Sequence, residues 1–167
     1  QGVIIENYYK RFNYRLNLDH EINSRFKLGV TFNTTYSKNR RSFNDNTYTG
    51  ISTNALGASP LMPAYEEDGS YASFEDYQAN WLSDNPVKSA REIRAFTNGY
   101  RALGTIAGEY KFSKKLYFKT SWSGDVNFNF DTQFKSPLTA DAEAFGGEAF
   151  EGDFRNVSWL NETTLHF

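Results

Sequence analysis

The chain has 167 residues, a formal net charge of −2 and no cysteine. The lack of cysteine excludes a disulfide framework and a thiolate metal site, and the charge balance offers no basic surface of the kind that nucleic acid requires. Aromatic residues make up 17% of the chain although its mean hydropathy is only −0.66. Such a composition fits strands with a single apolar face, and it does not fit a disordered chain.

Residues 8–36 predict a β-hairpin. In the first arm, Phe12, Tyr14, Leu16 and Leu18 alternate with polar residues, so one face of the strand is apolar and the other is polar. The second arm repeats this pattern, and the polar residues 21–24 link the two. We predict strands over 8–20 and 25–38. Both are longer than the ~5–6 residues usual in soluble proteins and closer to the ~9–11 of a membrane-spanning strand.

The next segment, residues 39–95, holds three of the four prolines and loses the alternation, which predicts a long loop. Within it, residues 73–83 fit a short helix with Phe74, Tyr77 and Trp81 on one stripe. A second hairpin follows, with strands predicted over 97–112 and 116–131 and the short link 113–115 between them. Residues 132–156 predict another long loop, and residues 157–167 predict a final strand.

The links therefore alternate between short and long. This order is typical of an outer-membrane β-barrel, which has short periplasmic turns and long extracellular loops. Every backbone polar group in hydrocarbon must be paired, so a membrane sheet has to close on itself. Five strands are too few for closure, since such barrels begin at ~8 strands. We therefore expect an all-β, antiparallel segment, residues 1–167, of one larger transmembrane barrel domain.

Several pieces of the chain resemble one family. They are FNYRLNLDHEINSRFKLGVTFNTTYSKN (12–39), SPLMPAYEEDGSY (59–71), NPV (85–87), YRALGTIAGEYKFSKKLYFKTSWSGD (100–125) and SWLNETTLHF (158–167). In this order and spacing they resemble the C-proximal barrel of SusC/RagA-type TonB-linked outer-membrane proteins of Bacteroidetes. The resemblance implies a 22-stranded barrel, with a plug domain and a TonB-binding segment outside these 167 residues.

The resemblance also implies a function and a set of partners. It implies an importer of oligosaccharides or peptides in the outer membrane, working with a SusD-like surface lipoprotein and energised by TonB, ExbB and ExbD. From the apolar strand faces we expect contact with outer-membrane lipid, and we predict no cofactor. Two alternatives stay open: a soluble β-sandwich such as a carbohydrate-binding module, and a barrel that serves as a receptor or adhesin without transport.

Aromatic side chains crowd the first long loop. They are candidates for contact with cargo or with a partner protein, because aromatic residues are favoured at interface cores. The candidates are Tyr65, Tyr71, Tyr77 and Trp81. The alternative is that these residues form the loop's own small core.

Charged residues suggest fewer sites. Carboxylates at 66, 67, 68, 75 and 76 could bind Ca²⁺, but they lack EF-hand spacing, and a solvated acidic loop fits them better. Lys38, Arg40 and Arg41 could meet phosphate groups of lipopolysaccharide or simply be solvated. The polar strand faces, with Arg11, Arg15, Asp19, Glu109, Asp125 and Asp131, are expected to line the lumen or touch a plug. No catalytic motif is present, and His20 and His166 have no metal-ligand spacing, so we predict neither an enzyme nor a metal site.

Overall fold

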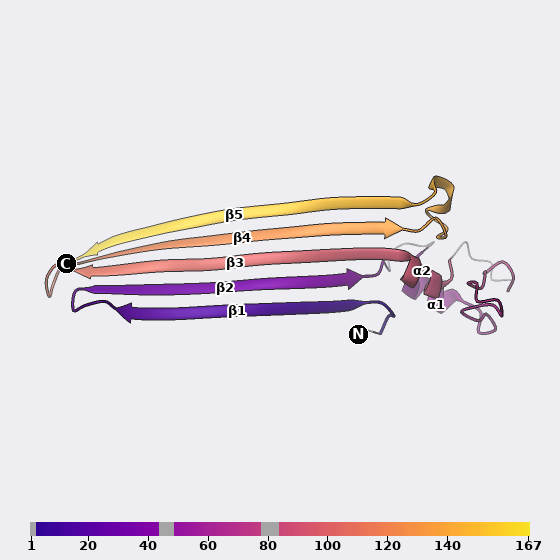
Figure 1. The fold of residues 1–167 in the computed structure, drawn as a ribbon, viewed down its shortest axis with the longest axis horizontal. Helices are drawn as coiled ribbons and strands as arrows, with labels where there is room; N and C mark the ends of the chain where they lie inside the picture. The colour runs from indigo at the N-terminus through magenta and orange to yellow at the C-terminus, as the bar shows by residue number, and fades with distance from the viewer. Residues whose placement is uncertain (1–2, 44–48, 78–83) are drawn as a thin grey trace. The chain divides into compact units, whose positions relative to one another are not determined.

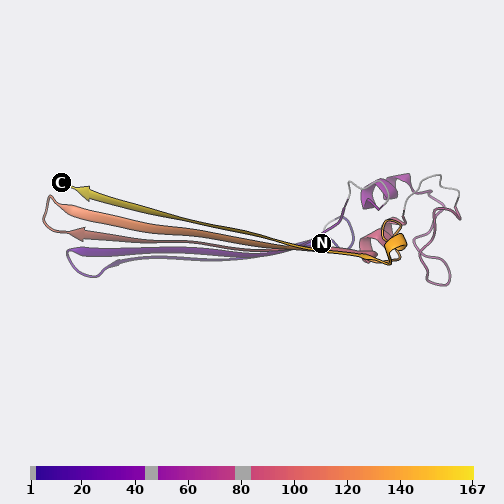
Figure 2. The same cartoon turned by 90° about the horizontal axis from the view of Figure 1, so that it is seen from above.

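The computed structural model describes residues 3–43, 49–77 and 84–167. Its strands are β1 (Tyr8–Glu21), β2 (Phe26–Arg41), β3 (Ile93–Lys111), β4 (Tyr117–Lys135) and β5 (Glu148–His166). They form one sheet in the order β1-β2-β3-β4-β5, with neighbours running antiparallel (Figure 1). Seen edge-on, the strands lie in a single layer (Figure 2). The prediction of five antiparallel strands is therefore confirmed.

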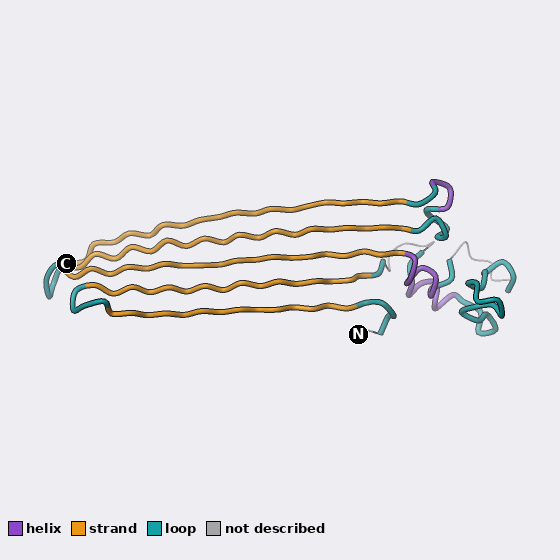
Figure 3. The backbone as a smooth tube through the Cα atoms, viewed as in Figure 1, coloured by secondary structure: helices purple, strands orange, loops and turns teal. Residues whose placement is uncertain are grey.

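Helices occur only in the two long links among the described residues (Figure 3). They are α1 (Ile51–Gly57), α2 (Pro86–Glu92) and the 3-10 helix η1 (Glu143–Phe145). The helix predicted over 73–83 is wrong where it can be checked, because residues 74–77 form a turn, and residues 78–83 lie outside the described part of the chain. No helix in the described residues is long and apolar enough to cross a membrane.

The predicted boundaries need correction, most of all for β5. This strand begins at Glu148 rather than at 157, so the second long link is confined to residues 136–147. Residues 148–155 also alternate, but their apolar residues lie on the other face of the strand from those of residues 157–167. By strand periodicity Phe150 and Phe154 share a face with Ser158, while Arg155 shares a face with Trp159. Their acidic and glycine content indicated a loop, and pairing in the sheet overrides that weak preference. β2, β3 and β4 also run farther into the long links than predicted.

Both short links are turns in which a side-chain oxygen accepts hydrogen bonds from backbone N–H groups two and three residues later. In the first, the Asn23 side-chain oxygen accepts hydrogen bonds from the backbone N–H groups of Arg25 and Phe26, both at 2.9 Å. In the second, the Ser113 hydroxyl accepts from the N–H groups of Lys115 at 3.2 Å and Leu116 at 3.1 Å. Asn and Ser favour turns because their side chains can satisfy the backbone in this way.

The chain divides into two compact units. We call the first the link unit (Gln1–Lys10, Lys38–Thr97 and Phe130–Gly152) and the second the strand unit (Arg11–Ser37, Asn98–Asn129 and Asp153–Phe167). Among the described residues, every buried apolar side chain belongs to the link unit: Ile51, Ala72, Phe74, Ala90, Ile93, Ala95 and Ala142. The strand unit therefore has no buried apolar core in the part of the chain that the structure describes.

Candidate binding surfaces

One face of the strand unit is apolar and bare. Ring contacts across neighbouring strands identify it: Phe12 stacks with Tyr36 at a centroid distance of 6.4 Å, and Tyr36 contacts Tyr100 at 4.8 Å. Farther across the sheet, Trp122 stacks with Trp159 at 6.1 Å. These two tryptophans are 57% and 74% exposed. By strand periodicity, the same face carries further exposed side chains: Tyr14, Leu16, Leu18, Ile106, Phe112 and Leu165.

The apolar character of this face ends at a definite point along the strands. On β2 it runs over residues 26–36 and gives way to Lys38 and Arg40 on the same face. On β5 its apolar residues lie at 157, 159, 165 and 167, with Asn161 and Thr163 between them, and Arg155 precedes them. On β1, Phe12 is preceded by Lys10. The long-link end of this face is thus charged on each of these strands.

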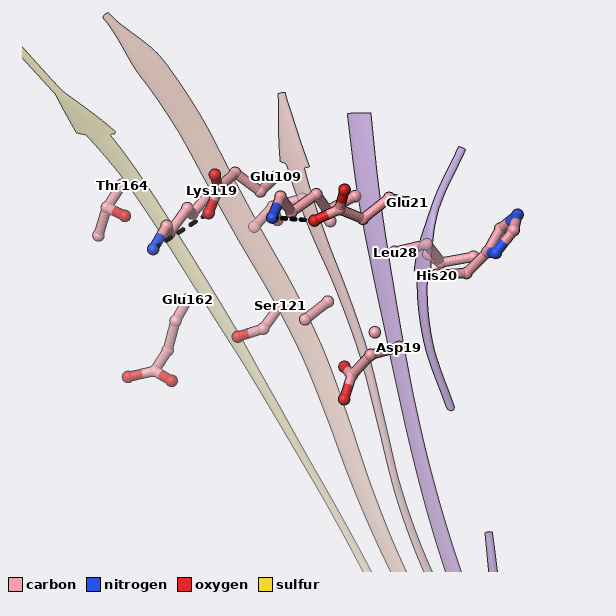
Figure 4. Close-up of a pocket in the computed structure, with 14 residues that line it drawn as sticks. Asp19, His20, Glu21, Leu28, Glu109, Lys119, Ser121, Glu162 and Thr164 are labelled. Atoms are coloured by element: carbon pink, nitrogen blue, oxygen red, sulfur yellow. Dashed lines mark hydrogen bonds and ion pairs between the residues drawn. The ribbon is translucent and has the colours of Figure 1, made fainter. Parts of the chain in front are cut away.

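The opposite face of the strand unit is polar and forms a hollow of about 810 Å³ near the short links (Figure 4). Lys27 pairs with Glu21, and the Lys119 ammonium lies 3.2 Å from a Glu109 carboxylate oxygen. Six charged side chains of the strands line this hollow: Asp19, Glu21, Lys27, Glu109, Lys119 and Glu162. The carboxylates outnumber the lysines, so the hollow carries net negative charge. His20 is also among the lining residues, and its ring points away from the labelled carboxylates (Figure 4).

The rest of the polar face is cross-linked by charge pairs and hydroxyls. The Arg101 guanidinium donates to both carboxylate oxygens of Asp125, at 3.0 and 2.6 Å. Thr105 and Ser123 hydroxyls lie 2.8 Å apart. Asp125 and Glu109 were predicted on the polar face, and both lie there, paired with Arg101 and Lys119. Contact with a plug or lumen stays a prediction.

The three candidate tyrosines of the first long link lie in the link unit, and each has an intramolecular partner. Tyr65 and Tyr71 form an antiparallel bridge with ring centroids 5.5 Å apart. The Arg91 guanidinium lies over the Tyr65 ring at 5.6 Å. The Tyr71 hydroxyl donates to Glu92 at 3.1 Å, and burial, together with this carboxylate, raises the pKa of Tyr71. Both partners belong to α2, so the pair anchors this part of the link to that helix.

Tyr77 is likewise engaged within the link. Its hydroxyl donates to Glu66 at 3.3 Å, and burial and the Glu66 charge raise the pKa of Tyr77. The fourth candidate, Trp81, lies outside the described residues. These contacts favour a structural role for the described tyrosines, and their contact with cargo or a partner stays a prediction.

The acidic residues of the same link do not converge. Asp68 accepts hydrogen bonds from the Ser70 N–H at 2.9 Å and the Ser70 hydroxyl at 2.6 Å, which lowers the pKa of Asp68. This tight turn needs Gly69, whose φ of +85° suits glycine. Across the described residues, no three His, Cys, Asp or Glu side chains gather as metal ligands would. The five carboxylates considered for Ca²⁺ all belong to that part of the chain, and their assignment to a solvated acidic loop stays a prediction.

Sequence reasoning missed the polar hub of the link unit, which is built on Asn85. Its side-chain oxygen accepts from the Val87 N–H at 2.9 Å and so caps α2, while its amide donates to the carbonyls of Ala64 and Ala72, both at 3.0 Å. Beside it, buried Asp84 pairs with Lys88. The signal was present: Asn followed by Pro is a helix start, with Asn as N-cap and Pro at the first helical position.

The basic residues at the end of β2 separate onto two faces. Arg41 lies over the Phe43 ring at 5.6 Å, and its guanidinium lies 3.8 Å from an Asp131 carboxylate oxygen. Lys38 and Arg40 instead both lie over the ring of Phe96, at 5.2 and 5.8 Å. The three predicted cations therefore do not form one site.

Comparison with known proteins gives one informative relative. No protein-family model matches the chain. The chain is similar to the TonB-dependent receptor P26 of Formosa agariphila. The two are 25% identical over 171 aligned residues, which cover 100% of this chain and 16% of that receptor. The chain thus spans a small part of the length of the relative it matches.

Proposed function

We propose that this chain forms five neighbouring strands of a transmembrane β-barrel in a TonB-dependent receptor of a bacterial outer membrane. The bare apolar face of the strand unit carries the proposal. Its stretch on β2, residues 26–36, is as long as the ~9–11 residues with which a tilted strand crosses a bilayer. On β5 the apolar residues at 157, 159, 165 and 167 span the same length and flank Asn161 and Thr163. The similarity to a named TonB-dependent receptor supports the same assignment.

The energetics favour lipid over water at this face. Moving one Leu, Ile or Phe side chain out of water stabilises a protein by about 1.5–3 kcal/mol. A face with several such side chains exposed would therefore cost on the order of 10 kcal/mol, which is as large as the whole stability of a typical domain, about 5–15 kcal/mol. Lipid removes this cost without any second layer of protein.

The two edges of the sheet support membership of a larger barrel. β1 and β5, of 14 and 19 residues, are the end strands of the sheet. Long unpaired edges bind further strands readily, and in hydrocarbon they have to be paired. In our proposal, strands elsewhere in the receptor pair with both edges.

The soluble β-sandwich is the competing hypothesis. A sandwich covers the apolar face of each sheet with a second sheet. The described residues form a single sheet, and its apolar face is exposed. The observation that motivates the barrel therefore counts against the sandwich.

The finer proposal concerns transport. The two short links face the periplasm and the two long links face the exterior, as in other outer-membrane barrels. The receptor imports oligosaccharides or peptides, a SusD-like lipoprotein covers it, and TonB with ExbB and ExbD supplies the energy. The folded long link, with its own core and its tyrosines, supports an ordered extracellular surface that such a partner or cargo requires.

Alternating spin labels test the membrane assignment. Leu16 and Asn17 are neighbours on β1 whose side chains point to opposite faces. A nitroxide attached to cysteine at position 16 of the full-length receptor in vesicles should be relaxed by oxygen, which concentrates in lipid. A nitroxide at position 17 should respond to a water-soluble nickel chelate. Equal response of both positions to the chelate would refute the lipid-facing assignment.

Transport itself needs a separate test that distinguishes an importer from a non-transporting receptor or adhesin. Cells carrying the full-length protein should accumulate a labelled oligosaccharide or peptide in the periplasm, and a proton uncoupler should abolish this accumulation. Surface binding that continues unchanged, without accumulation in untreated cells, would favour the receptor or adhesin.

A further inference from the structure

The link unit carries a cluster of cations on the face of the sheet that continues the apolar face. We call it the basic patch: Lys10 of β1, Lys38 and Arg40 of β2, and Arg94 of β3. By strand periodicity, Lys10 shares a face of β1 with Phe12. In the same way, Lys38 and Arg40 share a face of β2 with Tyr36, and Arg94 shares a face of β3 with Tyr100. The patch therefore begins where the apolar residues end on three adjacent strands.

Aromatic rings hold the cations of the basic patch in place. Phe96 lies beneath both Lys38 and Arg40, at 5.2 and 5.8 Å from the ring centroid. The Lys10 ammonium lies 5.3 Å from the centroid of Tyr8. Such cation–π contacts orient the charged groups without neutralising them.

The positive charge of the patch is poorly compensated. Arg40 pairs with Glu6 and donates to the Ala90 carbonyl at 3.4 Å. Among the described residues, no carboxylate is paired with Lys10, Lys38 or Arg94, and Lys10 and Arg94 are exposed. Four cations against one carboxylate leave a net positive surface.

Two of these cations are placed against each other. Phe12 and Tyr36 are cross-strand partners, and two residues farther along each strand are Lys10 and Lys38. In an antiparallel pair this register makes Lys10 and Lys38 direct neighbours, and like charges directly opposite destabilise a sheet. An anion between the two ammonium groups would remove the repulsion.

We propose that the basic patch binds the phosphate groups of membrane lipids, at the bilayer surface on the long-link side. This inference rests on the proposed membrane assignment of the strand unit. Charge complementarity selects an anion, and the position of the patch directly after the apolar face selects one anchored in the same bilayer. Each Lys or Arg held near an anionic membrane surface strengthens binding about fivefold.

A local reporter tests the proposal in the full-length receptor. Its own cysteines are replaced by serine, and Asn98, which shares the face of Phe96 and Tyr100 on β3, is replaced by cysteine that carries a bimane fluorophore. Vesicles of neutral phosphatidylcholine contain increasing amounts of either brominated phosphatidic acid or brominated phosphatidylcholine, both of which quench bimane on contact. We expect phosphatidic acid to reach half-maximal quenching at a more than tenfold lower mole fraction.

Variants assign that preference to the patch. The double variant Lys10→Gln/Lys38→Gln should reduce the preference on the order of 20-fold, from the fivefold contribution of each cation, while Lys38→Arg should retain it. The matched control, Lys114→Gln/Lys115→Gln in a short link, removes the same charge and should change nothing. An unchanged preference in the patch variant would overturn the inference, as would equal quenching by both lipids. Displacement of phosphatidic acid by millimolar inorganic phosphate would also overturn it, because the patch would then serve a soluble anion.

A second reporter separates this inference from the proposed function. Bimane on cysteine at Val157, within the apolar face of β5, should be quenched by both brominated lipids alike. If neither lipid quenches it, the membrane assignment itself fails. If both lipids quench it but the reporter at position 98 shows no preference, only the phosphate site fails.

Discussion

A lysine at Leu16 tests the apolar face most directly, because the expected cost depends on depth. Leu16 lies four residues from Phe12 along β1. Each residue advances a strand by ~3.3 Å, and barrel strands tilt by ~40°, so the two positions differ by roughly 10 Å in depth. The apolar band of a barrel is ~25 Å tall. If Phe12 lies near its rim, Leu16 lies near its middle.

The magnitude follows from that depth. A lysine on the lipid face costs about 2–4 kcal/mol at the midplane and about 0–1 kcal/mol near the interface. We expect Leu16→Lys to lower the free energy of unfolding by the larger amount. Phe12→Lys should lose the smaller amount plus about 0.5–1.5 kcal/mol for its ring contact with Tyr36. Asn17→Lys, on the polar face next to Leu16, should change stability by less than about 0.5 kcal/mol.

Refolding of the full-length receptor into phosphatidylcholine vesicles allows the measurement. Guanidinium titration followed by tryptophan fluorescence gives the free energy of unfolding from the midpoint and slope. If Asn17→Lys lowers the free energy of unfolding by as much as Leu16→Lys does, or by more, Leu16 does not face lipid. A neutral effect of Leu16→Lys would also contradict the lipid-facing assignment, since the side chain would then reach water.

Three further predictions concern single contacts. Asn85→Ala removes the α2 cap and two hydrogen bonds to link carbonyls, so amide exchange in α2 should accelerate by an amount equivalent to about 2–4 kcal/mol. A Cβ on Gly99 would lie 2.8 and 2.9 Å from side-chain oxygens of both neighbouring strands, whereas nothing lies within 4 Å at Gly124; Gly99→Val should lower the unfolding midpoint and Gly124→Val should not. Burial and the Glu92 carboxylate raise the pKa of Tyr71 above 10.0, so its stabilising contribution is complete below pH 10 and is lost as the pH rises through the raised value. Tyr71→Phe should remove this step from the pH dependence of link proteolysis.

The sequence predicted the strands well where one face is uniformly apolar. Residues 12–18 alternate without interruption, residues 26–36 do so except at Thr34, and β1 and β2 contain these stretches. The start of β3 was missed because Ile93 and Ala95, on its polar side, are buried in the link unit. A strand end covered on that side has no polar alternation to detect.

The sites were predicted less completely than the strands. A crowd of tyrosines indicates a cluster, but which carboxylate each hydroxyl reaches depends on how the link folds. The Tyr71 hydroxyl donates a hydrogen bond to Glu92, twenty-one residues away along the chain. A local sequence pattern carries no information on such a distant partner. The Asn85 cap was readable from its neighbour Pro86, whereas its bonds to Ala64 and Ala72 were not.

The strands are longer than a bilayer crossing requires, so under our proposal one part of each lies in lipid and another part lies in water. β3, β4 and β5 each have 19 residues, about 60 Å at ~3.3 Å per residue, yet only ~9–11 residues are needed to cross a bilayer. If the strand unit crosses the membrane as proposed, part of the excess belongs to the link unit, which holds residues 93–97, 130–135 and 148–152 of these strands. In the link unit the face that continues the apolar face carries the cations Lys38 and Arg40, and this unit also contains the buried apolar side chains. A segment in lipid needs no buried core, because lipid takes up its apolar side chains, whereas a segment in water needs one to fold. The same strands can therefore lack a core at one end and have one at the other.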